Sequence, residues 1–146
     1  MKIKNIDKLR EELYKSLDFC SFQFESAEIT HYEKVEYEED RLTEENARKW
    51  GIRSLEKPIC LKVFADGRCV HNWQDKAKRR LFLTVEEDEI SMWESNDTEQ
   101  KYDYVQRWEY KEYPSKTILF MEISLLLSRI AYKTWDEAGK PNPYKE

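Results

Sequence analysis

The sequence is poor in glycine, in cysteine and in long apolar segments, and each shortage excludes a class of function. Only three glycines occur in 146 residues, so no glycine-rich loop of the P-loop or Rossmann kind is present to bind a nucleotide phosphate. No apolar run approaches the ~20 residues that a membrane-spanning helix needs. Three cysteines are too few, and odd in number, for a disulfide framework, which predicts a reducing compartment and a cytoplasmic protein.

The remaining composition is typical of one folded domain with a polar surface. Charged residues make up 38% of the chain and aromatic residues 14%, and the aromatic share is far too high for a disordered segment. The length fits a single domain with its own core, which we expect to cover residues 1–140, with residues 141–146 as a loose tail. The formal net charge of −5 argues against a partner recognised mainly through its phosphates.

Two short helices are predicted in the first third of the chain. Residues 6–18 repeat an apolar side chain every three or four positions, and Asn5 or Asp7 can cap that helix. Residues 43–52 have Thr43 as a candidate N-cap, with Gly51 suited to the left-handed position after the last turn.

A long helix is predicted near the C-terminus, over about residues 116–138. Ser115 can cap its start, and Gly139, with two prolines beyond it, marks its end. Because the first half of this segment is apolar on nearly every side, we expect it to be the buried helix of the domain.

Alternating apolar and polar residues predict strands between these helices. We expect one strand over Ile29–Tyr37, a hairpin over residues 59–73, a second hairpin over residues 81–93, and a further strand over residues 102–110. The predicted fold class is therefore α+β: an antiparallel meander of four to six strands packed on the long C-terminal helix, with an N-terminal helix and one short helix.

The segment CLKVFADGRCVHNW sets the expected register of the first hairpin. Its Asp66-Gly67 pair predicts a two-residue turn that places Cys60 opposite Trp73 and Phe64 opposite Cys69. The two thiols are then roughly 13 Å apart along the strands, at ~3.3 Å per residue, too far to share a zinc ion or a disulfide. Cys69 and His71 share a face, but no further ligands or activating groups are placed near them. We interpret the thiols as small hydrophobic side chains.

The same alternation gathers large aromatic side chains on one face of the predicted sheet. Phe64, Trp73, Phe82 and Trp93 all lie opposite the face that carries the leucine, isoleucine and valine residues. The long helix can cover one face and the N-terminal helix the other. If the N-terminal helix lies elsewhere, the aromatic face is exposed, and exposed aromatic residues are typical of a binding surface. These four residues are the predicted partner-binding site.

Two weaker patterns give alternative hypotheses. Glu109-Tyr110-Lys111, with Asp97 or Asp103 upstream, matches the Asp…Glu-x-Lys arrangement of restriction-endonuclease-like nucleases, in which two carboxylates hold Mg²⁺. The nuclease hypothesis uses Asp103, Glu109 and Lys111.

A basic cluster, Lys76–Arg80, lies beside aromatic residues and gives a nucleic-acid-binding hypothesis. Glu122 is the other unusual residue, because it interrupts the most apolar segment of the chain. We interpret it as a carboxylate that reaches solvent or an ion-pair partner at the edge of the helix.

None of these patterns amounts to a catalytic constellation. The favoured hypothesis is a small acidic, non-enzymatic protein-binding module, of the kind found among inhibitors, immunity proteins and phage-type accessory factors. An acidic surface of this kind would also imitate nucleic-acid phosphates and block a DNA-binding enzyme. We expect the partner to be another protein, and we expect no cofactor, no metal ion and no membrane association.

Overall fold

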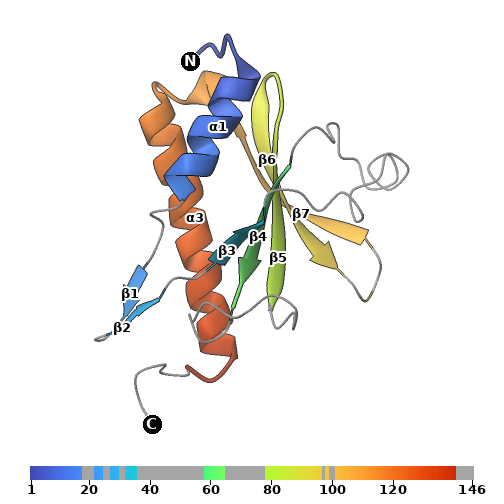
Figure 1. The fold of residues 1–146 in the computed structure, drawn as a ribbon, viewed down its shortest axis with the longest axis vertical. Coiled ribbons are helices and arrows are strands. Elements are labelled where there is room, and N and C mark those ends of the chain that lie inside the picture. Colours follow the sequence, from blue (N-terminus) through green and yellow to red (C-terminus); the bar gives the residue numbers. More distant parts are fainter. Residues whose placement is uncertain are drawn as a thin grey trace.

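A computed structural model describes residues 1–17, 58–64, 78–96, 98 and 101–140, together with the backbone of three short strands between residues 22 and 35 (Figure 1). The described elements, in chain order, are α1 (Ile6–Ser16), β1 (Phe22–Phe24), β2 (Ala27–Ile29), β3 (Tyr32–Val35), β4 (Ile59–Val63), β5 (Arg79–Val85), β6 (Glu89–Asn96), β7 (Lys101–Glu109), the 3-10 turn η2 (Tyr110–Glu112) and α3 (Lys116–Glu137).

Five of the strands form one antiparallel sheet in the order β3-β4-β5-β6-β7, so each strand lies beside its neighbour in sequence. This confirms the predicted α+β class and the meander. β1 and β2 form a separate two-stranded antiparallel pair. In the described part of the chain, no helix is both long and apolar enough to span a membrane.

Both helices pack on the same face of the five-stranded sheet (Figure 1). Alternate residues of β4, β5 and β6 turn their leucine, isoleucine, valine and methionine side chains to that face, and one stripe of each helix meets them. The helix residues of this core are Leu9, Leu13 and Leu17 from α1 and its C-terminal turn, and Leu119, Ile123, Leu127 and Ala131 from α3. The N-terminal helix therefore does not cover the aromatic face.

Two sequence-based expectations about strands are wrong. The strand predicted over Ile29–Tyr37 is divided, because β2 ends at Ile29 and pairs with β1, whereas β3 pairs with β4. The Asp66-Gly67 register is also wrong, since Cys60 faces Val35 on one side and Phe82 on the other. Both edges of β4 are thus occupied, and no ladder position beside Cys60 remains for Trp73.

The reason for the register error is that a turn signal is local, whereas strand pairing is decided by burial on both faces of the sheet. β5 offers β4 a match on each face, with Leu83 opposite Ile59 in the helix-covered core and Phe82 opposite Cys60 on the far side. The short helix expected over residues 43–52 and the Asp66-Gly67 turn itself lie outside the described residues.

The predicted helix ends are confirmed. The Asn5 side chain accepts a hydrogen bond from the Lys8 backbone N–H (3.0 Å) at the start of α1, and Ser115 accepts one from Ile118 (3.3 Å) at the start of α3. Gly139 has φ +88° and donates to the Asp136 carbonyl (3.1 Å), while Lys140 donates to the Trp135 carbonyl (3.0 Å). This pair of bonds is a Schellman motif, which fixes the end of α3.

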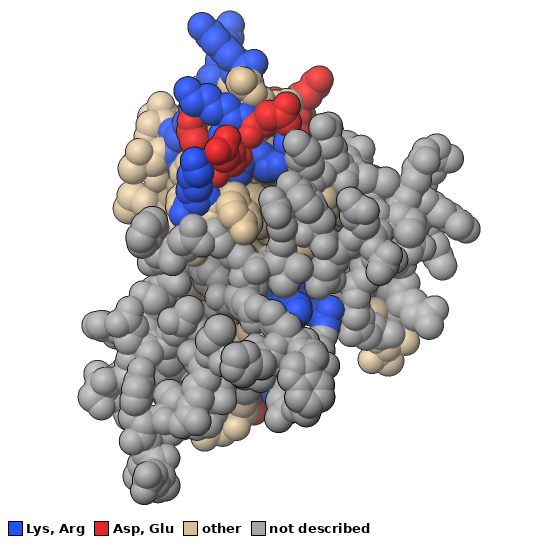
Figure 2. Space-filling model, in the orientation of Figure 1, with Lys and Arg blue, Asp and Glu red and all other residues tan. Residues whose placement is uncertain are grey.

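The sides of α1 that face solvent carry alternating charges (Figure 2). Lys15 pairs with Glu11 at 3.0 Å one helical turn away, and Lys8 lies 4.0 Å from Glu12. Glu12 also accepts a hydrogen bond from Lys116 (3.0 Å), so this ion pair joins α1 to the first turn of α3. Such exposed pairs contribute little individually, and of these three the Lys116–Glu12 pair is the one that joins the two helices.

Tyr110 fastens the hairpin between β5 and β6 to the end of β7. Its hydroxyl lies 2.5 Å from the carbonyl oxygen of Glu86 and 3.1 Å from that of Glu89, and its backbone N–H donates to the Asp88 carbonyl (3.0 Å). Burial, and then the nearby charges of Glu86 and Asp88, raise the pKa of the Tyr110 hydroxyl above its usual range. The folded protein therefore holds this phenol in its protonated form.

This arrangement predicts that Tyr110→Phe lowers the free energy of unfolding by about 1 kcal/mol at pH 7, since a buried hydrogen bond is lost without a change of shape. The unfolded chain ionises this phenol near pH 10 and the folded chain only at higher pH, so the Tyr110 contribution is complete below pH 10 and declines as pH rises above it. Urea unfolding at pH 7 and pH 11 should show the gap between variant and parent narrowing.

Tyr104→Phe, at an exposed tyrosine of β7, is the control and should stay within about 0.5 kcal/mol of the parent at pH 7. A Tyr110→Phe gap that is the same at both pH values would contradict this account.

Candidate functional site

The side of α3 that points away from the core carries an unusual set of exposed apolar side chains. Among the described residues, five large hydrophobic side chains are exposed, and four of them lie on this helix. They are Ile118 (40% exposed), Met121 (54%), Leu125 (49%) and Tyr132 (44%). Isolated exposed apolar residues are ordinary, but several aligned on one element are typical of an interaction surface.

The spacing of these side chains places them in one stripe. Ile118, Met121 and Leu125 are separated by three and then four residues, and Tyr132 follows one heptad later, with Ser128 at the intermediate position. Residues three and four apart lie on the same side of an α-helix. The stripe therefore has the a/d pattern by which one helix packs against another.

Charged residues run along one side of the stripe. Glu122, Arg129, Lys133 and Asp136 are all exposed and fall within about a quarter-turn of it. We name the apolar stripe and these four charged residues together the outer face of α3. Its charges balance locally, with two acidic and two basic side chains, although the whole chain carries −5. An apolar centre with a charged border is the usual composition of a protein-binding surface.

The opposite side of α3 explains why the outer face is presented to solvent. Leu119, Ile123 and Leu127 are fully buried against the sheet and α1, at intervals of four residues. Met121 follows Leu119 by two residues, and Leu125 follows Ile123 by two. At about 100° per residue, the stripe therefore points about 200° around the helix from the buried row. The expectation that α3 is the buried helix of the domain is therefore wrong in one respect: only one of its apolar sides is covered.

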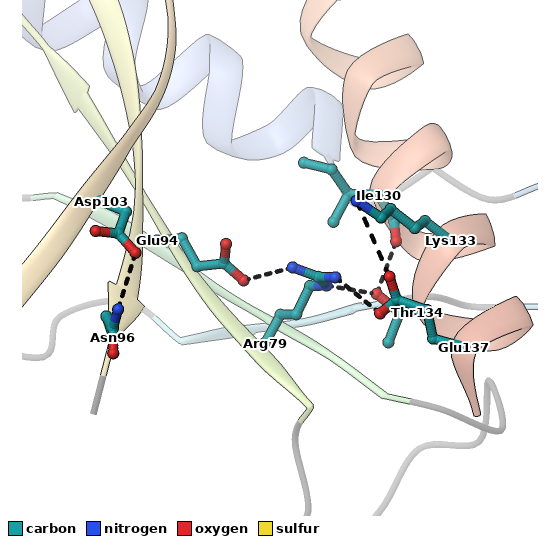
Figure 3. A network of polar contacts seen from close by, with 8 residues as sticks. All are labelled: Arg79, Glu94, Asn96, Asp103, Ile130, Lys133, Thr134 and Glu137. Atoms are coloured by element: carbon teal, nitrogen blue, oxygen red, sulfur yellow. Dashed lines mark hydrogen bonds and ion pairs between the residues drawn. The ribbon is translucent and has the colours of Figure 1, made fainter. Parts of the chain in front are cut away.

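A polar network holds the C-terminal half of α3 in this orientation (Figure 3). Arg79, at the start of β5, donates to Thr134 (Nε–Oγ1, 3.0 Å), to Glu94 on β6 (2.9 Å) and to Glu137 (3.0 Å). Thr134 in turn donates to the Ile130 carbonyl (2.7 Å). All three guanidinium nitrogens of Arg79 thus donate a hydrogen bond. Through this side chain the last two turns of α3 are bound directly to β5 and indirectly to β6.

The electrostatics of this network favour the charged form of Arg79. Partial burial by itself lowers the pKa of Arg79. The hydrogen bond and charge of Glu94, together with the charge of Glu137, raise that pKa by more than burial lowers it, so the net shift is upward. The Arg79 side chain is only 22% exposed, so solvent weakens these contacts less than it weakens an ion pair on α1.

One group of carboxylates has a spacing suited to a metal ion. Oxygen atoms of Glu86, Asp88 and Glu89 lie within 4.8 Å of one another at the tip of the β5–β6 hairpin. The same region contains the buried side chain of Arg10, whose charge lowers the pKa of Tyr110 while the carboxylates raise it. Ser91 donates a hydrogen bond to the Glu89 carboxylate (3.2 Å), and the backbone carbonyls of Glu86 and Glu89 accept from Tyr110, so we assign the cluster to the fold.

The residues of the predicted aromatic site are more buried than those of the outer face of α3. Phe64 (5% exposed) and Phe82 (0%) are buried, Trp93 is half-buried, and Trp73 lies outside the described residues. Phe82 packs on Tyr102 with their ring centroids 4.9 Å apart. The aromatic face was expected to be exposed if the N-terminal helix lay elsewhere, and for Phe64 and Phe82 this is wrong.

The open part of that face is at the edge strand. Trp93 contacts Tyr104 edge to face, with centroids 5.5 Å apart, and Tyr104 is 55% exposed. Tyr104, a residue outside the predicted set, is the most exposed aromatic side chain among the described residues. Partner binding through Phe64, Trp73, Phe82 and Trp93 stays a prediction.

The three residues of the nuclease hypothesis are not brought together. Asp103 and Glu109 are six residues apart on β7, roughly 20 Å at ~3.3 Å per residue. They also point to opposite faces, because β7 has an irregularity in its pairing with β6 between them. Asp103 lies opposite Glu94 and Glu109 lies opposite Glu89, and these two β6 residues, five apart, point to opposite faces. Asp103 accepts a hydrogen bond from the Asn96 amide (3.1 Å; Figure 3).

Glu109 has cations on both sides. Its carboxylate lies 3.6 Å from the Arg107 guanidinium and 3.5 Å from the Lys111 ammonium, close enough for weak surface ion pairs. The Glu-x-Lys pattern is thereby explained as part of the charged edge of β7. The two carboxylates of the hypothesis are too far apart to hold one Mg²⁺ together.

The basic cluster Lys76–Arg80 is divided by the sheet. Arg79 is engaged in the network with Glu94 and Glu137, whereas Arg80 belongs to the opposite face, where it pairs across the strands with Lys62. Lys78 is exposed, and residues 76 and 77 lie outside the described part of the chain. Within this cluster, Arg79 is therefore already engaged by the fold and not by a phosphate backbone.

The remaining singled-out residues have ordinary structural places. Cys60 is buried, as expected of a thiol that acts as a small hydrophobic side chain, whereas Cys69 and His71 lie outside the described residues. Glu122 is exposed on α3, as we expected, so the helix buries no carboxylate there.

Comparison of the chain with protein families, with curated proteins and with solved structures finds no match. The chemistry of the surface therefore carries the functional argument.

The Arg79 network predicts a specific stability effect. Arg79→Gln should lower the free energy of unfolding by about 1–2 kcal/mol, because three charge-assisted or polar contacts are lost at a partly buried site. Hydrogen exchange should quicken in the last turns of α3, where Ala138 donates to the Thr134 carbonyl.

Arg107→Gln removes an exposed arginine whose one ion pair in the described structure is the weak contact to Glu109, and it should cost no more than about 0.5 kcal/mol. Equal losses for the two variants, or unchanged exchange in α3, would refute the role assigned to Arg79.

Proposed function

We propose that the protein is a small acidic, non-enzymatic protein-binding module, and that its docking surface is the outer face of α3. The observation that supports this most directly is the stripe of Ile118, Met121, Leu125 and Tyr132, each 40–54% exposed on a helix whose other side is firmly held. A rigid helix with an exposed apolar stripe is a ready partner for a groove or for a second helix.

Energetic considerations favour this use of the stripe. Each of the four side chains would remove roughly half of its surface from water on docking, which is worth about 1 kcal/mol apiece at ~25 cal/mol per Å². Arg79 and the Schellman end of α3 keep the surface ordered in the unbound protein, so little ordering entropy is lost when a partner arrives.

The nucleic-acid hypotheses receive less support from the described residues. The nuclease residues are separated along β7, and Arg79 is neutralised within the fold. The local charge balance of the outer face also gives no reason for it to imitate a phosphate backbone. A partner protein, bound through apolar contacts with a charged border, fits this surface best.

Capture from the cells that produce the protein tests the proposal. A tagged parent chain should retain a stoichiometric protein, which can be another protein or the untagged chain itself. Leu125→Glu, at an exposed position that does not alter the core, should abolish that capture. Tyr104→Glu, at the edge of the aromatic face, is the matched control and should retain it.

Two other outcomes would be informative. Loss of capture with Tyr104→Glu alone would move the docking surface to the aromatic face of the sheet. Recovery of no stoichiometric protein by the parent would overturn the proposed function. Circular dichroism of each variant establishes that the fold is intact.

A further inference from the structure

The outer face of α3 is nearly symmetrical about Leu125. Ile118 lies seven residues before Leu125 and Tyr132 seven residues after it, so an exposed apolar side chain marks each end of the stripe. Glu122 lies three residues before Leu125 and Arg129 four residues after it, with opposite charges. A surface with this arrangement is complementary to itself when one copy is reversed.

The geometry points to a second copy of this chain as the partner of the outer face. Two α3 helices would cross antiparallel about a twofold axis at Leu125, the commonest symmetry of protein oligomers. Ile118 of one copy then meets Tyr132 of the other, and the two Leu125 side chains meet at the axis. This inference rests on the proposed function, because it names the protein that docks on the same face.

Charge complementarity is the observation that selects this partner. In the antiparallel arrangement, Glu122 of each copy comes within reach of Arg129 of the other, so two reciprocal ion pairs flank the apolar centre. Among the described residues, neither Glu122 nor Arg129 forms an ion pair within its own chain, so both are available to the other copy. In a parallel arrangement Glu122 of one copy and Arg129 of the other would lie on opposite sides of the apolar seam, so neither ion pair would form.

The length of the stripe also fits helix-to-helix packing. From Ile118 to Tyr132 it covers two heptads, about 21 Å at 1.5 Å per residue. Side chains spaced three and four apart pack into a facing helix at a shallow crossing angle. Because this is a short seam with Ser128 at one of its five positions, we expect a dimer that dissociates on dilution and not an obligate one.

The overall charge of the protein does not prevent this contact. Two copies with a net charge of −5 repel each other weakly at a distance, and salt screens that repulsion. On the contact surface itself, Glu122 and Asp136 are balanced by Arg129 and Lys133. The residues that come closest are therefore apolar or oppositely charged.

Sedimentation of the purified full chain over on the order of a hundredfold range of concentration tests the inference. The parent, with a monomer mass of 17.8 kDa, should shift from monomer to dimer as its concentration rises. Leu125→Glu should weaken the dimer by at least about thirtyfold, the effect expected for a central interface residue.

Charge reversal tests the antiparallel arrangement itself. Glu122→Arg and Arg129→Glu should each weaken the dimer, because each places two like charges opposite each other at both ends of the contact. The double variant should recover it, since the complementary pairs are restored in reverse. An equimolar mixture of the two single variants should form a heterodimer more tightly than either forms a homodimer. Lys15→Glu, on the exposed side of α1, is the control and should leave association unchanged.

Each remaining outcome decides the matter. A parent that stays monomeric throughout, or a dimer indifferent to Leu125→Glu, overturns the second copy as partner. So does a double variant that associates no better than the single ones. If a monomeric parent still captures a different protein through Leu125, the protein-binding function stands and only this inference fails. If neither association nor capture occurs, both fail.

Discussion

The C-terminal helix α3 has apolar residues on two sides, and the fold covers only one of them. Which side is buried decides which residues form the core and which form the exposed surface. Leu119, Ile123 and Leu127 complete a core with the strands and with α1, leaving Ile118, Met121 and Leu125 on the opposite side in water. Exposing apolar surface carries a cost that only a later contact recovers. This exposed stripe is the surface on which we propose that a partner docks.

Two sets of polar contacts, one at Arg79 and one at Tyr110, stabilise the arrangement around α3. At one end of the sheet, Arg79 bonds to Thr134 and Glu137 of α3 and to Glu94 of β6. At the other end, Tyr110 closes the β5–β6 hairpin just before α3 begins. The Arg79 contacts at the C-terminal half of α3 and the Lys116–Glu12 ion pair at its first turn hold the helix with its stripe directed away from the core. This rigidity is what makes the outer face a defined surface.

The sequence predicts local features of this fold well. The caps at Asn5 and Ser115 and the turn at Gly139 depend on a few adjacent residues, and the sequential order of the strands follows from short connections. The register of β4 is not predictable in the same way, because Cys60 pairs with partners more than twenty residues away on each side. The turn preference of the nearby Asp66-Gly67 pair is weaker than the gain from pairing β4 with β5, which buries apolar side chains on both faces of the sheet.

The outer face of α3 is not predictable from the sequence for a related reason. An apolar segment predicts burial, but the residues themselves do not say which of its sides the fold will cover. Ile118, Met121 and Leu125 have the three-and-four spacing of an interaction stripe, and the same spacing also fits a core stripe. Conversely, strand alternation places Phe64 and Phe82 on a predicted aromatic face without deciding whether that face is covered, and both residues are buried. Only the burial of each side chain in the folded structure distinguishes these cases.

The central claim, that the outer face of α3 is open in the monomer, is tested most directly by methionine oxidation. Met121 is 54% exposed on that face and Met92 is fully buried in the core, so each chain contains its own internal standard. Treatment of dilute protein with peroxide, followed by peptide mass spectrometry, compares the two rates. The account predicts that Met121 is oxidised at least about tenfold faster than Met92, a ratio set by local opening of the core. Equal protection of both methionines at high dilution would contradict it.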